Sequence, residues 1–238
     1  GTSQFDQGPG TFNARVESTT RVAGWGLERK WSADSRTQLR VSRSDDRSDT
    51  FSTTVRPDVF NTSQTQITLQ HDWNTAIGNL LVGAESIKEA VSGTQAYAVH
   101  SRTTDAAFVG LTGQAGQHLW QANLRRDETS QFGGATTGFA SYGFQITPNW
   151  RPHVAYGTSF KTPSFNTLYY VSPFFTGNPS TQPERGKNRE AGLTYSQGLH
   201  EVKLTRFDNR VRGFITREPV VANVPRARLQ EVREVIPG

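Results

Sequence analysis

The residue types that most often carry out covalent chemistry are scattered along this sequence. The five histidines share no spacing typical of metal ligands: His71, His100, His118, His153 and His200. Ser101 is the only serine that directly follows a histidine, His100. Consecutive residues of a strand face opposite sides, so these two could not act together there. The sequence also lacks the G-x-S-x-G, Walker and H-E-x-x-H motifs. We therefore predict that the protein is not an enzyme.

An acidic cluster offers the hard oxygen ligands that calcium prefers. It consists of Asp45, Asp46 and Asp49, with Arg43 and Arg47 interleaved. The two arginines neutralise much of the negative charge, so we interpret this cluster as a solvated loop tip.

Aromatic residues gather between positions 156 and 187, where the sequence loses both helical and strand periodicity. Four of them lie close together: Tyr169, Tyr170, Phe174 and Phe175. An exposed cluster of this kind marks a contact surface for a ligand or a neighbouring loop. The alternative is that these side chains pack within the loop and give it its shape.

Composition favours a protein built from many strands joined by turns. The 238 residues are 34% hydrophobic and 11% aromatic, with 22 glycines. The absence of cysteine excludes disulfides and thiolate metal sites. The absence of methionine leads us to expect a processed piece or fragment. The net charge of +5 is dispersed along the chain, so we expect no nucleic-acid partner.

Apolar and polar residues alternate with the period of a strand in at least six segments. In the clearest of these, Ala140, Tyr142, Phe144 and Ile146 alternate with more polar or smaller neighbours. No helix is expected, and no window approaches the ~18 apolar residues of a transmembrane helix. A chain of this kind can span a membrane only as a barrel.

Short and long connections alternate between these segments. Short turns are expected near 32–35, 74–79, 112–117, 147–149 and 196–199, and long segments near 44–63, 88–103, 127–136, 160–186 and 217–226. A transmembrane β-barrel has this asymmetry. Four of the five tryptophans lie beside the short turns, as an interfacial aromatic girdle requires: Trp31, Trp73, Trp120 and Trp150.

These patterns predict an all-β fold, an antiparallel transmembrane β-barrel with a wet or plugged lumen and ten or eleven strands in this chain. Such a count suggests part of a larger barrel, because an open edge is not tolerated in lipid. We assign residues 1–230 to the barrel and leave the tail 231–238 unassigned.

The segment 156–195 carries a long motif. Its residues are Tyr156, Gly157, Thr158, Ser159, Phe160, Lys161 and Pro163, then Gly177, Asn178 and Pro179, then Pro183 and Glu184, followed by a Glu-x-Gly at 190–192. This motif resembles the barrel signature of TonB-dependent outer-membrane transporters. Within that family, the segments 92–114, 125–165 and 223–230 are most similar to the cobalamin (vitamin B12) transporters. The similarity is weak before about Arg36, and the tail EVREVIPG departs from the family.

The resemblance implies the middle portion of a 22-stranded barrel in the outer membrane of a Gram-negative bacterium. It implies cobalamin or another large chelate as ligand, and membrane lipid, a plug domain and TonB as partners, the last two acting through regions N-terminal to this chain. It implies that Thr94 contacts the ligand. It also implies calcium in the extracellular loops, with Asp6 as a ligand. No covalently bound cofactor is expected.

Three alternatives stay open. The same architecture could serve a ferric siderophore or haem, because the ligand is chosen by loops and plug. The chain could belong to an outer-membrane barrel enzyme, or to a soluble β-rich interaction module.

Overall fold

The computed structural model describes residues 2–5, 14–51, 56–172, 175–216 and 221–235. Twelve strands form one antiparallel sheet in the order β1-β2-β3-β4-β5-β6-β7-β8-β9-β12-β13-β14. Their bounds are β1 Thr2–Phe5, β2 Ala14–Ser32, β3 Ser35–Phe51, β4 Asp58–Thr75, β5 Gly78–Gly93, β6 Ser101–Ala115, β7 His118–Thr129, β8 Gly133–Phe144, β9 Trp150–Lys161, β12 Glu184–Gln197, β13 His200–Thr216 and β14 Ala222–Val235. The predicted all-β antiparallel fold is confirmed, with eleven long strands beside the four-residue β1.

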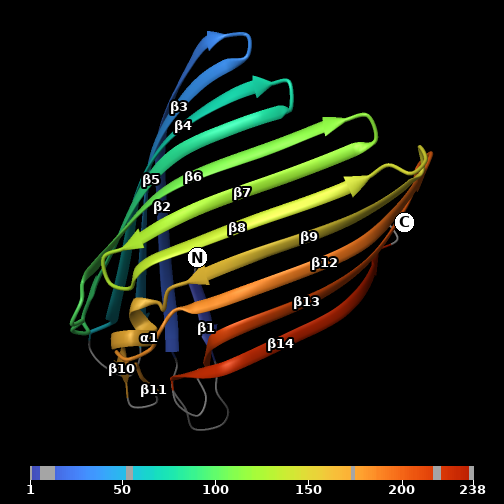
Figure 1. Cartoon of the computed structure of the whole chain (residues 1–238). Helices are drawn as coiled ribbons and strands as arrows, with labels where there is room; N and C mark the ends of the chain where they lie inside the picture. The colour runs from blue at the N-terminus through green and yellow to red at the C-terminus, as the bar shows by residue number, and fades with distance from the viewer. Residues whose placement is uncertain (1, 6–13, 52–55, 173–174, 217–220, 236–238) are drawn as a thin grey trace.

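The sheet is strongly curved, so that β2–β5 form the back wall of a trough and β8, β9 and β12–β14 its front wall (Figure 1). Every strand in it pairs with its neighbour in sequence except across the segment between β9 and β12. Pairing of β14 with β13 continues to Val235, opposite Lys203, and so includes five residues of the tail 231–238.

The two faces of the sheet differ in polarity, as the alternation predicts. On β4, Leu69 lies beside Leu39 of β3 and Ala84 of β5, and its side chain is exposed on the convex face. The next residue, Gln70, points to the concave face and donates to Asp72 at 2.9 Å. The concave face is therefore polar and the convex face apolar over the same segment of strand.

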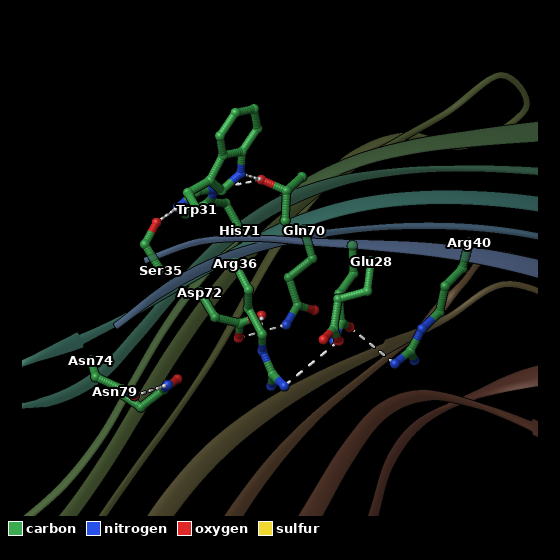
Figure 2. A network of polar contacts seen from close by, with 12 residues as sticks. Glu28, Trp31, Ser35, Arg36, Arg40, Gln70, His71, Asp72, Asn74 and Asn79 are labelled. Atoms are coloured by element: carbon green, nitrogen blue, oxygen red, sulfur yellow. Dashed lines mark hydrogen bonds and ion pairs between the residues drawn. The ribbon is translucent and has the colours of Figure 1, made fainter. Parts of the chain in front are cut away.

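Figure 2 shows these two faces close to one turn. Trp31, Ser35 and His71 lie on one side of the ribbon, and Arg36, Gln70 and Asp72 lie on the other. On the convex side the Trp31 indole donates to the Thr37 hydroxyl at 2.8 Å. On the concave side Arg36 reaches Asp72 at 3.4 Å.

The five short turns that the sequence predicts all lie at one end of the sheet, at the upper right of Figure 1. The four turn-side tryptophans, Trp31, Trp73, Trp120 and Trp150, lie within the last or first three residues of their strands at that end. Trp150 packs on Tyr195 with ring centroids 4.6 Å apart. This end therefore carries the row of aromatic residues that a membrane interface favours.

The other end holds the longer connections, but three of them are shorter than the sequence predicts. Strands β3 and β4 extend through most of 44–63, and β5 and β6 through much of 88–103. Between β7 and β8 only residues 130–132 form the turn. In these extensions most side chains on both faces are polar, with exceptions such as Phe60 and Val91, so the apolar period ends while the backbone pairing continues.

The segment between β9 and β12 also contains one helix, α1 (Phe165–Tyr169), and the two-residue strands β10 (Val171–Ser172) and β11 (Phe175–Thr176). The expectation of no helix was wrong here, because one turn is too short to show a 3.6-residue period. Within the described residues, no helix has the length and apolarity needed to cross a membrane.

Candidate ligand-binding site

Helix α1 lies at the end of the sheet that carries the longer connections, which we call the outer end (Figure 1). Its own sequence fixes it there. The chain leaves β9 after Lys161, and Ser164 then caps the helix by accepting a hydrogen bond from the Thr167 amide at 3.1 Å. Phe165 is buried with Val91 at the end of β5 and Tyr97 in the β5–β6 connection. This apolar contact joins segments about seventy residues apart in the sequence.

Arg102, at the start of β6, makes the most buried polar contact of this region. Its guanidinium donates to the Glu89 carboxylate at 2.9 Å and to the Pro163 carbonyl at 2.9 Å. It also lies 5.1 Å from the centre of the Phe165 ring. Only 4% of the Arg102 side chain is exposed, whereas 35% of the Glu89 side chain is. The first residues of the signature loop are thus held against the barrel wall by a charged group.

Two further hydrogen bonds hold α1. The Tyr97 hydroxyl donates to the Asn166 side chain at 2.8 Å, and Gln131 donates to the Tyr169 hydroxyl at 2.6 Å. Burial, with Tyr170 nearby, raises the pKa of Tyr97. The Tyr97 hydroxyl therefore keeps its proton at neutral pH and remains a donor.

The second half of the signature ties the loop to β13 and β14. The Asn178 amide donates to the Thr167 carbonyl at 2.9 Å, and its side chain donates to the Val221 carbonyl at 3.1 Å. Gly177 lies so close to Leu168 that a Cβ would meet that backbone at 2.8 Å. Glu184 accepts from the Ile215 amide at 2.8 Å. These contacts of the signature residues all lie within the chain and stabilise the loop.

The first half of the signature is the outer end of β9. Gly157 lets the Phe139 ring approach, since a Cβ there would meet it at 3.2 Å. The Thr158 hydroxyl accepts from the Gly138 amide at 2.9 Å, and Phe160 lies under Arg185 at 5.0 Å. Lys161 pairs with Glu184 at 3.7 Å.

A cavity of about 460 Å³ opens between α1 and the outer ends of β3–β6. Its polar side chains are mostly uncharged and include Ser44, Thr62, Gln64, Ser164 and Asn166, and Phe60 and Phe165 add ring surface. Its charged lining residues are Asp46 and the Arg102–Glu89 pair. A site of this composition can hold a ligand by neutral hydrogen bonds and by ring contact.

Below this cavity the concave wall carries a network of paired charges. Arg125 donates to Glu85 at 2.6 Å and to Asp127 at 2.8 Å, reaching from β7 across to β5. Glu85 also accepts from Gln66 at 2.6 Å. Gln66, Glu85 and Arg125 border a second hollow of about 730 Å³. The wall is hydrophilic but its charges are largely compensated within the chain.

The structure places the candidate residues from the sequence as follows. Thr94 is exposed, and its hydroxyl donates to Asp58 at 3.1 Å and accepts from the Val59 amide at 3.2 Å. Thr94 does not line the cavity under α1. Its contact with a ligand stays a prediction.

Three residues of the aromatic cluster are described, and one is not. Tyr169 and Tyr170 pack against the Val91–Tyr97–Phe165 core, and Tyr170 lies 6.0 Å from Phe175 between ring centres. These contacts are those of the loop-packing interpretation. Phe174 lies outside the described residues, as does Asp6.

The acidic cluster is in strand β3, not at a loop tip. Asp45 pairs with Arg43 at 2.7 Å and Asp49 with Arg47 at 2.9 Å, while Asp46 faces the cavity on the other side of the strand. Among the described residues no group of three or more His, Asp or Glu side chains could hold a metal ion. Calcium therefore stays a prediction.

Sequence reasoning missed Arg102, Glu89, Tyr97 and Asn166. The residues in these contacts are 13 to 69 positions apart in the sequence, and no local spacing predicts them. The only signal was indirect, because Ser164 directly after a proline could have indicated a helix N-cap.

Comparison with known proteins agrees with this architecture. The family model described as "TonB dependent receptor-like, beta-barrel" matches residues 1–232. The vitamin B12 transporter BtuB of Photobacterium profundum is 26% identical over 232 residues, which cover 94% of this chain and 37% of that protein. The chain thus spans little more than a third of this curated relative.

Solved structures share the fold at low sequence identity. The siderophore receptor PirA from Acinetobacter baumannii superposes with a TM-score of 0.75 at 13% identity, over 95% of this chain and 42% of that chain. The Serratia marcescens hemophore receptor HasR, solved with its hemophore HasA and heme, gives a TM-score of 0.69 at 13% identity, over 94% and 46%.

Proposed function

Because the chain belongs to the TonB-dependent receptor β-barrel family, we propose that it forms part of an outer-membrane receptor that takes up cobalamin. In this role the concave wall and outer connections capture the ligand at the cell surface. Transport past a plug domain is then driven by TonB, and no covalent bond is made or broken.

The cavity under α1 is the observation that carries this proposal. Cobalamin is larger than the volume of about 460 Å³ of this cavity, so the cavity would take up one side of a ligand that presents many neutral amide groups and a flat ring system. Ser44, Thr62, Gln64 and Asn166 offer hydroxyl and amide partners for such groups. The Arg102 charge is already bound by Glu89 and Pro163. The similarity to a vitamin B12 transporter points to the same ligand class.

A ferric siderophore or haem is the second candidate. PirA, a siderophore receptor, and HasR, a hemophore receptor solved with heme, share the fold. An anionic chelate would be bound best by uncompensated arginine or lysine. Among the described residues, the side chains that line the cavity include one arginine, Arg102, and no lysine. Arg102 is already paired with Glu89. This charge balance favours the neutral ligand.

Localisation and partners follow from the same proposal. The apolar convex face suits lipid, and the row of tryptophans suits one membrane interface. The charged concave wall suits the polar surface of a plug domain. Calcium in the outer connections, with Asp6 as a ligand, remains a proposal of the family resemblance.

A binding titration tests the ligand. The intact protein in detergent is titrated with cyanocobalamin, with a ferric catecholate and with haem, and binding is followed by the ligand's own absorbance after dialysis. We expect submicromolar affinity for cyanocobalamin and at least ~100-fold weaker binding of the two others, a difference of about 2.7 kcal/mol. Tighter binding of the ferric catecholate or of haem would contradict cobalamin as the ligand while leaving the receptor family intact.

A further inference from the structure

The convex face of β12–β14 changes character along its length. Near the short turns it is apolar, with Leu193, Tyr195, Val202 and Leu204 paired across β12 and β13. Beyond these residues, toward the longer connections, basic side chains replace the apolar ones. The eight residues of this basic face are Arg185, Lys187, Arg189, Arg206, Arg210, Arg212, Arg226 and Arg228.

Strand register places these cations in direct cross-strand rows. Lys187 lies opposite Arg210, which lies opposite Arg228. The next row joins Arg185, Arg212 and Arg226 in the same way. All eight residues are exposed. Like charges directly opposite each other destabilise a sheet, so two such rows side by side call for an anion to compensate them.

The described part of this face supplies one carboxylate. Asp208 accepts from Arg210 at 2.9 Å and from Arg228 at 2.9 Å. Among the side chains that the structure describes, Lys187, Arg189, Arg206, Arg212 and Arg226 have no ion-pair partner within 4.0 Å. The excess charge of the basic face is therefore not neutralised by its described neighbours.

Basic residues elsewhere on the convex face are arranged differently. On β3, Arg43 pairs with Asp45 at 2.7 Å, and on β7, Arg126 pairs with Glu128 at 3.2 Å. Also on β3, Arg47 pairs with Asp49 at 2.9 Å. Among the described residues, adjacent cross-strand rows of cations are thus a feature of β12–β14.

We propose that the basic face binds the phosphorylated headgroups of a lipid in the membrane that surrounds the strands. The face begins where the apolar band ends, which is the depth of the headgroups. Adjacent strands lie about 4.8 Å apart, so side chains from three strands can converge on one phosphate. Arginine suits this role because its planar guanidinium binds phosphate oxygens in pairs. The inference rests on the membrane location proposed above.

Lipid retention tests the proposal. The intact protein in a neutral detergent is mixed with lipid A carrying both phosphates, freed of excess lipid, and analysed as an intact complex by mass spectrometry. The variant combines Lys187→Gln, Arg212→Gln and Arg226→Gln, which leaves the Asp208 pairs in place. At about 1 kcal/mol for each basic residue near an anionic surface, we expect retention to fall roughly 100-fold.

A matched control removes three charges from ion-paired positions of the same convex face, through Arg43→Gln, Arg47→Gln and Arg126→Gln. This control should retain lipid like the unmodified protein. Lipid A stripped of its phosphates should not be retained, and inorganic phosphate should not displace the bound lipid. Equal retention by the two triple variants, retention of stripped lipid, or displacement by inorganic phosphate would each overturn the proposal.

If the triple variant with Lys187→Gln, Arg212→Gln and Arg226→Gln does not fold, a measurement on the unmodified protein still tests the proposal. Retention should fall at least ~10-fold between low and half-molar salt, because the attraction is screened. Salt-independent retention would overturn the proposal. Cobalamin binding, measured on the same samples, reports separately on the proposed function.

Discussion

Replacing Arg102 with methionine is expected to lower the free energy of unfolding of the loop that contains α1 by about 2–4 kcal/mol. The change leaves the Glu89 carboxylate without the two hydrogen bonds it accepts at 2.9 and 3.0 Å, and leaves the Pro163 carbonyl without its donor. Glu89 is 35% exposed and can be partly rehydrated, so the expected loss lies toward the lower end for a buried pair. Protease sensitivity of the segment 162–183 measures the loosening of the loop.

Arg126→Met is the matched control for Arg102→Met. Arg126 also pairs with a glutamate, Glu128, but both side chains are more than half exposed, so its loss should cost less than about 1 kcal/mol. The double change Arg102→Met with Glu89→Gln should recover part of the loss, because no uncompensated charge remains. Equal protease sensitivity of Arg102→Met and Arg126→Met would contradict the anchoring role of Arg102.

Replacing Val82 with arginine is expected to destabilise the protein in a bilayer by roughly 2–4 kcal/mol. Val82 lies on the convex face, opposite His71 of β4 and Val109 of β6, inside the apolar band. An arginine there would have to bring its charge into lipid. Urea unfolding from lipid vesicles, followed by tryptophan fluorescence, measures the loss.

Leu81→Arg provides an adjacent aliphatic site on the opposite face. Leu81 lies on the concave side, opposite Asp72, which already pairs with Arg36. We expect Leu81→Arg to cost less than about 1 kcal/mol, because the long side chain can keep its charge in the water of the concave side. If Leu81→Arg were the more damaging of the two, the assignment of the lipid-facing side would be reversed.

The fold could be predicted from the sequence where one face is apolar. Alternation such as that of Ala140 and Tyr142 with Ser141 follows directly from a sheet with lipid on one side and water on the other. Beyond the apolar band this signal ends, because both faces are wet. For that reason residues 44–51 and 58–63 belong to β3 and β4 although their polarity predicted a loop.

The candidate site could be predicted only in part. The signature located the segment around α1, because its prolines and glycines interrupt the strand period. The partners of that segment could not be predicted. Tyr97 meets Asn166 across 69 positions, and this contact exists only because β5, β6 and β9 end at the same rim.

The signature residues themselves have a structural explanation. Gly177 allows close approach to Leu168, Asn178 bridges α1 to the start of β14, and Glu184 fastens the end of the loop to Ile215. A motif that identifies the family thus holds one outer connection in place over the concave wall. We propose that the ligand contacts other residues, chiefly those of the cavity under α1.

Uptake of radiolabelled cyanocobalamin by intact cells tests the central claim most directly. Cells that make the protein are compared with cells that lack it, each with and without functional TonB, in the presence of excess ferric catecholate. We predict accumulation that requires both the protein and TonB and that the ferric catecholate does not suppress. Accumulation that is independent of the protein or of TonB would contradict the account.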